Sequence, residues 1–470
     1  MNKKTFVFED QNKFAFLSGD FNPLHLDPIV SRRLLFGSMV VHGLHTLLWG
    51  LDNLVSINKE QMRLTSVFVR FQNVIRVGNT AICVIDRKSD NSAEINIYNK
   101  NELVTFINVV WQKEMLKSPE YYINEAFDAC LPDELTEEEY STASGSINLY
   151  LNISLLNTLF VDISKYINLN QIASLLSTTR IVGMKCPGLH SIYSSLECHF
   201  EELDNKTPNI SYKVKKMHKG SGQILINIES SIINGTIKAF RRPQQVKQIR
   251  FNEMKQLGFK GDFKNQKALI IGGSRGLGEV TAKILAAGGA DVHITYCHGK
   301  LDALRVVEEI SNEKFIAECF NLNILDEKVQ LPYEESSKWV PTHVYYFATP
   351  YIKQGKDGIF SEELFKYFYQ YYVIGFENVI NKLKSLGIKK VFYPSTIFIN
   401  SIQSGMCEYA MAKVAGEMFC NYYSALNGEV TIFTPRLPKM LTDQTTSIIP
   451  MNLKSPVELM NEYLIKFNVC

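Results

Sequence analysis

The sequence predicts two α+β blocks of antiparallel strands, followed by an α/β block with a doubly wound parallel sheet. Its 470 residues suit about three domains at roughly 150 residues each. Strand-like runs fill most of the first half, whereas strands and helices alternate from about residue 264, which is typical of a parallel sheet. We therefore expect blocks at 1–115, 149–242 and 264–470, with an acidic, Ser/Thr-rich connector over 116–148.

The composition is that of an ordinary globular protein, 46% hydrophobic and 21% charged. Fifty basic and 48 acidic residues leave a formal charge of +2, so neither nucleic acid nor an acidic membrane is expected as a partner. Charges interrupt the amino-terminal residues, and no apolar run approaches 20 residues, so neither a signal peptide nor a membrane helix is expected. Nine scattered cysteines without a Cys-x-x-Cys pattern favour reduced thiols and a cytoplasmic location.

The first block contains one helical segment and then several strands. Residues 44–54 are apolar enough for a buried helix. Runs of alternating or β-branched residues follow, separated by turn residues, and they predict strands over 67–71, 80–86, 94–98 and 103–111.

Ahead of that helix lies a turn-rich loop, residues 18–28, that reads Ser-Gly-Asp-Phe-Asn-Pro-Leu-His-Leu-Asp-Pro. Asp20 and His25 stand five residues apart on this loop. A carboxylate and an imidazole at that spacing can converge on a volume as small as one water molecule. The alternative interpretation is a buried Asp-His pair that caps a helix.

The loop continues into Phe36-Gly37 and Val41-His42-Gly43. Together these segments resemble the active-site loop of the MaoC-like (R)-specific enoyl-thioester hydratases, which have the hot-dog fold. The resemblance implies that Asp20 and His25 hold the water that adds to, or leaves, the β-carbon of an acyl thioester. It also implies that the N–H of Gly43, at the start of the central helix, polarises the thioester carbonyl, and it implies no metal.

The second block is similar to a degenerate copy of the first. Gly183-Met184 and the later Gly-Leu-His-Ser of 188–191 echo residues 37–39 and 43–46, and strand-like runs follow at 192–201, 210–214, 223–229 and 231–239. Nothing upstream matches Asp-x-x-x-x-His, and Pro187 stands near the position of His42. We therefore expect a non-catalytic second hot-dog that pairs with the first edge to edge, with His190 in a core or capping role.

The third block opens on a strand that runs into Gly-Gly-Ser-Arg-Gly-Leu-Gly and then a helix. A glycine turn in this context lets a pyrophosphate approach backbone N–H groups at the helix N-terminus. A second strand follows over 291–296. The predicted cofactor-binding residues of the turn are Gly272, Ser274, Arg275, Gly276, Leu277 and Gly278.

Tyr409 and Lys413 lie four apart on a predicted helix and therefore share one face, with Ser395 and Thr396 on an upstream strand end. The lysine can lower the phenol's pKa and so help proton exchange with a carbonyl or an alcohol. With the glycine turn, this set resembles the short-chain dehydrogenase/reductase family over 264–470. The resemblance assigns these residues to catalysis; the family's substrate-holding hydroxyl could be either Ser395 or Thr396.

The chain departs from that family's pattern in three places. Phe-Ala-Thr-Pro at 347–350 replaces the family's usual Asn-Asn-Ala-Gly, and Ala348 of this segment is expected beside the cofactor. Tyr372 stands near the position of the family's helix asparagine. Asn321 or Asn323 replaces the acidic residue that the family often has near the adenine. The second strand ends without an acidic residue for a ribose hydroxyl. Arg275, His298 and Lys300 could instead face a 2′-phosphate, which favours NADP(H) over NAD(H).

The two resemblances imply reactions on one metabolite, since a (3R)-hydroxyacyl thioester is the product of 3-oxoacyl reduction and the substrate of dehydration. The sequence therefore predicts a bifunctional acyl-thioester enzyme of fatty acid metabolism, in either direction, with coenzyme A or acyl carrier protein as the carrier. The Rossmann block could also support a homo-oligomer. The alternative is a hydratase with a non-catalytic nucleotide-binding or assembly module.

Overall fold

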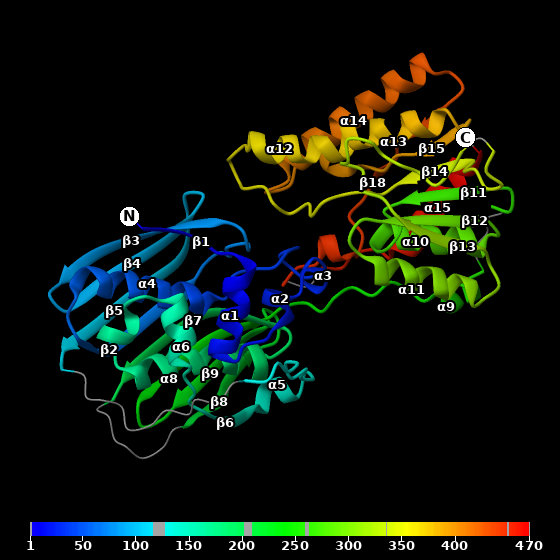
Figure 1. Ribbon diagram of the computed structural model, residues 1–470. Helices are drawn as coiled ribbons and strands as arrows, with labels where there is room; N and C mark the ends of the chain where they lie inside the picture. Colours follow the sequence, from blue (N-terminus) through cyan, green and yellow to red (C-terminus); the bar gives the residue numbers. More distant parts are fainter. Residues whose placement is uncertain are drawn as a thin grey trace. The chain divides into compact units, whose positions relative to one another are not determined.

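The computed structural model describes residues 2–115, 127–201, 209–258, 263–334, 336–448 and 451–469. The chain divides into two compact units (Figure 1). The first comprises residues 1–244 with 447–450, and the second comprises 245–446 with 451–470. Residues 116–126 of the predicted connector lie outside the described residues.

The first half of the first unit is a central helix against an antiparallel sheet. Helix α4 (Gly43–Asn58) is buried along most of its length because Leu47, Leu48 and Leu51 all face the core with no exposed surface. The predicted strands are present and longer than expected. They are β2 (Met62–Phe71), β3 (Thr80–Ser89), β4 (Ser92–Asn99) and β5 (Glu102–Lys113), preceded by β1 (Asn2–Thr5), α1 (Phe8–Ser18), α2 (Pro23–Leu26) and α3 (Pro28–Ser31).

The second half of the first unit repeats this arrangement. Its central helix α8 (Leu169–Arg180) runs directly into a π-helical turn, η1 (Ile181–Lys185). The other elements are α5 (Glu139–Thr142), β6 (Ser144–Asn148), α6 (Ile153–Leu159), α7 (Ile163–Tyr166), β7 (Ser191–Phe200), β8 (Asn209–His218), β9 (Gln223–Glu229) and β10 (Ile233–Arg241).

The two halves share one ten-stranded sheet in the order β1-β3-β4-β5-β2-β7-β10-β9-β8-β6. From the centre of the sheet outward, the order is β2, β5, β4, β3, β1 in the first half and β7, β10, β9, β8, β6 in the second, so the two halves have the same strand order. The seam is the antiparallel pair β2–β7, in which Val67 lies opposite Cys198. Pairing removes the exposed edge that each half would otherwise present. One hydrophobic core accordingly extends through both halves.

Two sequence interpretations of the second half were wrong in detail. The Gly-Leu-His-Ser segment at 188–191 leads into β7, not into a central helix like Gly43–His45. The residue equivalent to His42 is Asn168 rather than Pro187, because both occupy the N-cap position of the central helix with nearly identical backbone angles, φ −57° and ψ 129° against φ −58° and ψ 127°. Part of the predicted connector, β6, is an edge strand of the sheet.

The second unit is built on a six-stranded parallel sheet in the order β13-β12-β11-β14-β15-β17, the doubly wound order 3-2-1-4-5-6. Its strands are β11 (Lys267–Ile271), β12 (Asp291–Tyr296), β13 (Ala317–Asn321), β14 (His343–Tyr346), β15 (Lys390–Phe392) and β17 (Thr431–Phe433), with a separate pair β16 (Ser395–Thr396) and β18 (Arg436–Leu437). Its helices are α9 (Phe251–Gln256), α10 (Gly276–Ala287), α11 (Lys300–Ser311), α12 (Glu362–Tyr369), α13 (Gly375–Lys384), α14 (Cys407–Leu426) and α15 (Pro456–Val469).

Helices cover both faces of this sheet. They are needed on both, because successive side chains of β11 point to opposite faces and the apolar ones on each face must be buried. Ala268 and Ile270 belong to a core cluster with α9, α10, α11 and α15, whereas Leu269 and Ile271 belong to a second cluster with α13 and α14. The unit begins at residue 245, so α9 belongs to it and it extends further toward the amino terminus than the expected boundary at 264. Among the described residues, no helix is long and apolar enough to cross a membrane.

A group of charges, of which Lys283 and Glu279 are buried and Glu309 and Arg305 partly exposed, joins α10 to α11. Lys283 has no exposed side-chain surface and lies 2.8 Å from the Glu279 carboxylate and 2.7 Å from the Glu309 carboxylate. Arg305 bonds to the same two carboxylates at 2.9 Å and 2.7 Å. Because a buried charge is tolerated only when it is paired, removal of one member is costly.

Lys283→Met should therefore destabilise the second unit by about 3–5 kcal/mol, because two carboxylates lose their buried partner. For a unit of this size, thermal unfolding should occur roughly 6–20 °C lower. Lys366→Met is the matched control, since Lys366 forms the same i,i+4 pair with Glu362 on an exposed surface of α12. Equal melting temperatures for both variants would contradict a stabilising role for this group of charges.

Candidate active sites

Asp20 occupies the short loop between α1 and α2 and is 2% exposed. Its Oδ1 accepts a hydrogen bond from the backbone N–H of Asn22 at 3.2 Å, and its Oδ2 accepts one from the hydroxyl of Thr179 at 2.7 Å. Burial raises the pKa of the Asp20 carboxyl, while the nearby His25 and these two hydrogen bonds oppose that shift. The carboxyl can therefore exchange a proton closer to neutral pH than an exposed aspartate can.

His25 lies on α2, and its Nδ1–H donates to the carbonyl of Val40 at 2.7 Å. This bond fixes the tautomer, so that Nε2 carries the lone pair when the ring is neutral. Burial lowers the pKa of His25, and the Asp20 carboxylate opposes that effect. At neutral pH the ring is thus a neutral base whose Nε2 can accept a proton.

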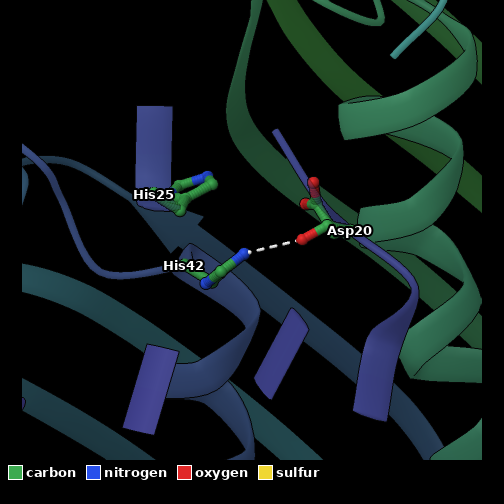
Figure 2. Close-up of side chains that lie close together, drawn as sticks. All are labelled: Asp20, His25 and His42. Atoms are coloured by element: carbon green, nitrogen blue, oxygen red, sulfur yellow. Dashed lines mark hydrogen bonds between the residues drawn. The ribbon is translucent and has the colours of Figure 1, made fainter. Parts of the chain in front are cut away.

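His42 lies beneath His25, and the two rings stack with centroids 3.8 Å apart (Figure 2). Its Nε2–H donates to the backbone carbonyl of Asp20 at 3.1 Å, the dashed line in Figure 2. Its Nδ1 lies 3.1 Å from the side-chain oxygen of Gln11. Burial and the neighbouring His25 hold the pKa of His42 well below its usual range. The hydrogen bond from His42 to the Asp20 carbonyl thus holds the Asp20 loop in place.

The ligand-forming atoms of Asp20, His25 and His42 all lie within 4.8 Å of one another. A single water can bridge a carboxylate and an imidazole across such a gap, since each hydrogen bond spans roughly 2.8 Å. Nε2 of His42 faces the backbone carbonyl of Asp20, so in this arrangement that nitrogen offers no lone pair to a metal ion.

Asp20 and His25 line a cavity of about 70 Å³. Gly43 also lines it, at the first position of α4, where a backbone N–H has no acceptor within its own helix. The second half of the unit supplies part of the wall, including Thr179, Val182, Gly183 and Tyr193. The cavity has room for a few water molecules.

The π-helical turn η1 fits closely against the Asp20 carboxylate. A Cβ atom on Gly183 would lie 2.2 Å from Oδ1 of Asp20, so only glycine fits at this position. The Asn22 side-chain amide reinforces the contact by donating to the carbonyls of Gly183 and Gly188, each at 3.1 Å. The loop of the first half is thereby fastened to the second half.

In the second unit, the predicted glycine turn joins β11 to α10. A Cβ on Gly278 would lie 2.2 Å from the carbonyl oxygen of Gly272, so the close packing of the turn requires glycine there. Arg275 precedes α10 and lies 3.6 Å from the Asp443 carboxylate. Among the other residues predicted to bind the cofactor, Ser274 is buried, and Gly276 and Leu277 are the first two residues of α10. Ala348 lies beside Gly272. His298 and Lys300 follow β12 and are exposed.

Tyr409 and Lys413 lie on α14 as predicted, and both are buried. Burial raises the pKa of Tyr409 to about 12, and a hydrogen bond with the side chain of Thr396 opposes the rise. Burial lowers the pKa of Lys413 to about 7, and its ammonium donates to the carbonyl of Pro394 at 2.8 Å. Both candidate hydroxyl residues, Ser395 and Thr396, are buried, and the side chain that opposes the rise in the Tyr409 pKa is that of Thr396.

Tyr372 stands in a π-helical turn, η2 (Gln370–Ile374), beside this pair. The Lys413 ammonium lies 3.9 Å above the centre of its ring, a cation–π contact. The Tyr372 hydroxyl lies 2.6 Å from the hydroxyl of Thr349, which belongs to the Phe-Ala-Thr-Pro segment. The two departures from the dehydrogenase pattern, residues 347–350 and Tyr372, thus contact each other. The Tyr372 ring also contacts the ammonium of Lys413.

Comparison with known proteins bears on the first half. Residues 2–107 match the family model described as the MaoC like domain. The amino-terminal domain is MaoC-like. Over 72 residues the chain is also 38% identical to the peroxisomal hydratase-dehydrogenase-epimerase of Saccharomyces cerevisiae. That match covers 15% of this chain and 8% of the yeast protein, so the chain spans only a small part of that relative.

Solved structures of short-chain dehydrogenases resemble part of the chain. One from Salmonella enterica serovar Typhi is 18% identical, covers 44% of this chain and 91% of its own, and has a TM-score of 0.38. One from Burkholderia cenocepacia, in complex with NADP, is 20% identical, covers 40% and 79%, and has a TM-score of 0.34.

Three residues of the MaoC-like site carried no role in the sequence analysis. His42 could have been suspected, because it sits inside the Val-His-Gly segment. Thr179 had no signal, and Gly183 was noted only as an echo of Gly37, since both follow Asp20 by about 160 positions and lie in the half that lacks an Asp-His pair. Only the packing of η1 against the loop reveals them.

Gly183→Ala should destabilise the first unit by about 1–3 kcal/mol, the usual cost of forcing a methyl group into a filled site. The added Cβ must displace either the Asp20 carboxylate or η1. Thermal unfolding measures the loss, and Gly220→Ala is the control because a Cβ there meets nothing within 4 Å. If Gly183→Ala melted like the wild type, the close fit would be refuted.

Proposed function

We propose that the chain is a bifunctional acyl-thioester enzyme. The MaoC-like site would interconvert a 2-enoyl thioester and a (3R)-hydroxyacyl thioester by adding or removing water. The second unit would interconvert the 3-hydroxyacyl and 3-oxoacyl thioesters with NADP(H). The observation that carries the first activity is the convergence of Asp20, His25 and the Gly43 N–H on one cavity in a MaoC-like domain.

Hydration at this site would begin with a water held between Nε2 of His25 and the Asp20 carboxyl. The Gly43 N–H would donate to the thioester carbonyl and stabilise the negative charge that develops there as the water oxygen bonds to the β-carbon. The water loses one proton to His25 or Asp20, and the α-carbon gains one. The raised pKa of Asp20 suits this exchange, since a carboxyl of ordinary pKa rarely carries a proton near neutrality.

The second half of the first unit would act as a non-catalytic hot-dog. Asn168 occupies the N-cap position of its central helix, as His42 does in the first half, and the sequence of the second half holds no Asp-x-x-x-x-His segment. Its contribution would be a wall for the acyl chain, made by Val182 and Tyr193. The shared sheet and core support this division of labour.

The second unit has residues that fit a dinucleotide. The glycine turn at the N-terminus of α10 would hold the pyrophosphate, and Arg275, His298 and Lys300 would approach a 2′-phosphate. NADP(H) would supply or accept the hydride. Tyr409 would give a proton to the 3-oxo oxygen during reduction, Thr396 would steady that oxygen or the phenol, and Lys413 would contact the nicotinamide ribose.

A hydratase with a non-catalytic second unit is the second candidate. Tyr372 and the segment 347–350 favour it, because an aromatic ring lies under Lys413 where the family's pattern has an asparagine. The intact Tyr409 and Lys413 favour catalysis. Nicotinamide absorbance with a short 3-oxoacyl thioester separates the two, since tight NADPH binding without oxidation would support the second candidate.

Asp20→Asn should reduce hydration of a crotonyl thioester by roughly 10² to 10⁴, the range for loss of a general acid–base group. His25→Ala should have an effect in the same range. Loss of enoyl absorbance measures the rate, and Asp86→Asn, a change on the exposed end of β3, is the control. Wild-type rates in Asp20→Asn and His25→Ala would remove the pair from the mechanism.

Tyr409→Phe should abolish most NADPH oxidation while leaving NADPH binding intact, because only the proton-donating hydroxyl is lost. Oxidation is followed with a 3-oxobutyryl thioester, and binding by fluorescence titration. Tyr422→Phe on the same helix is the control, since Tyr422 is 61% exposed. Equal turnover by wild type and Tyr409→Phe would show that Tyr409 is not the proton donor.

A further inference from the structure

Thr179 differs from the other hydroxyl residues of helix α8. Ser174, Ser177 and Thr178 each donate to a carbonyl of their own helix, at 2.7–2.8 Å, as hydroxyls within helices commonly do. The Thr179 hydroxyl instead donates outside its helix, to Oδ2 of Asp20, 159 positions earlier in the chain. Both residues are buried, so bulk solvent has little access to this bond.

The helix that carries Thr179 is fitted to the carboxylate at a second point. Gly183 lies four residues further along and therefore on the same face, where its lack of a side chain admits Oδ1. Asn22 donates its backbone N–H to Oδ1 and its side-chain N–H groups to carbonyls around η1. Each carboxylate oxygen thus has one donor, and the two donors come from different halves of the unit.

We propose that Thr179 is a positioning residue of the hydration site, whose hydroxyl holds the Asp20 carboxylate toward the water-binding cavity. This inference rests on the proposed hydratase function and extends it. The second half, which has no Asp-His pair of its own, supplies the hydroxyl that orients the catalytic carboxylate of the first. It therefore contributes to proton transfer as well as to the wall of the cavity.

The charged and titratable groups around Asp20 make this bond measurable. His25 faces the carboxyl from α2, His42 approaches it from the start of α4, and Arg242 acts on His25. Because a hydroxyl that donates to a carboxylate stabilises its charged form, Thr179 lowers the pKa of Asp20 against the effect of burial. Removing the hydroxyl should therefore raise that pKa, whichever protonation state of Asp20 is active.

The test compares Thr179→Val, which keeps the shape of the side chain, with Thr179→Ser, which keeps the hydroxyl. We expect Thr179→Val to lower kcat for crotonyl thioester hydration about ten- to hundredfold, the range for a hydrogen bond to a charged group. KM should change about twofold or less, and the limb of the pH profile that belongs to Asp20 should move to higher pH. Thr179→Ser should restore kcat and the profile.

Ser177→Ala is the matched control, since the Ser177 hydroxyl donates only within its own helix. It should retain the wild-type kcat and pH profile. Wild-type kcat and pH profile in Thr179→Val would overturn the proposal, as would a folded Thr179→Ser that behaves like Thr179→Val.

A second measurement separates this proposal from the proposed function. Carboxyl ¹³C NMR of the full chain labelled at aspartate gives the titration of Asp20 directly, with its resonance assigned by its loss in Asp20→Asn. The apparent pKa should rise in Thr179→Val and return in Thr179→Ser, even if no thioester tried is hydrated. Failure of hydration alone would reject the hydratase function, whereas an unchanged Asp20 titration in Thr179→Val would reject the role of Thr179.

Discussion

The first unit depends on one constraint, the burial of the Asp20 carboxyl at the junction of its two halves. A buried carboxyl without hydrogen bonds would cost several kcal/mol, so its donors must be in place whenever the unit is folded. One donor is the Asn22 N–H in its own loop, and the other is the Thr179 hydroxyl in the second half. The site therefore requires α8 and η1 to lie against the loop.

That requirement accounts for the architecture around it. The β2–β7 seam joins the two sheets, and the shared core fixes the central helices α4 and α8 relative to one another. His42 at the start of α4 then binds the Asp20 carbonyl from one side, while Gly183 leaves room for the carboxylate on the other. The second half, whose sequence holds no Asp-x-x-x-x-His segment, thus completes the surroundings of a carboxyl that belongs to the first half.

Sequence reasoning predicted what depends on local patterns. Periodicity gave the strands of both halves and the parallel sheet of the second unit, and the loop motif located Asp20, His25 and Gly43, which the structure brings to one cavity. It could not locate Thr179 or Gly183, because their role depends on contacts across about 160 residues. It also misaligned the two halves, since it followed a short Gly-Leu-His similarity, whereas the N-cap position of the central helix relates Asn168 to His42.

The central claim is that both halves of the first unit build one acyl-thioester site around Asp20. A crystal structure of the full chain with a saturated butyryl thioester tests it most directly. The account predicts the thioester oxygen at about 3 Å from the Gly43 nitrogen. It also predicts the β-carbon beside His25 and Asp20, with the acyl chain against Val182 and Tyr193. An acyl chain that contacts the first half alone, or that binds away from Asp20, would contradict the claim.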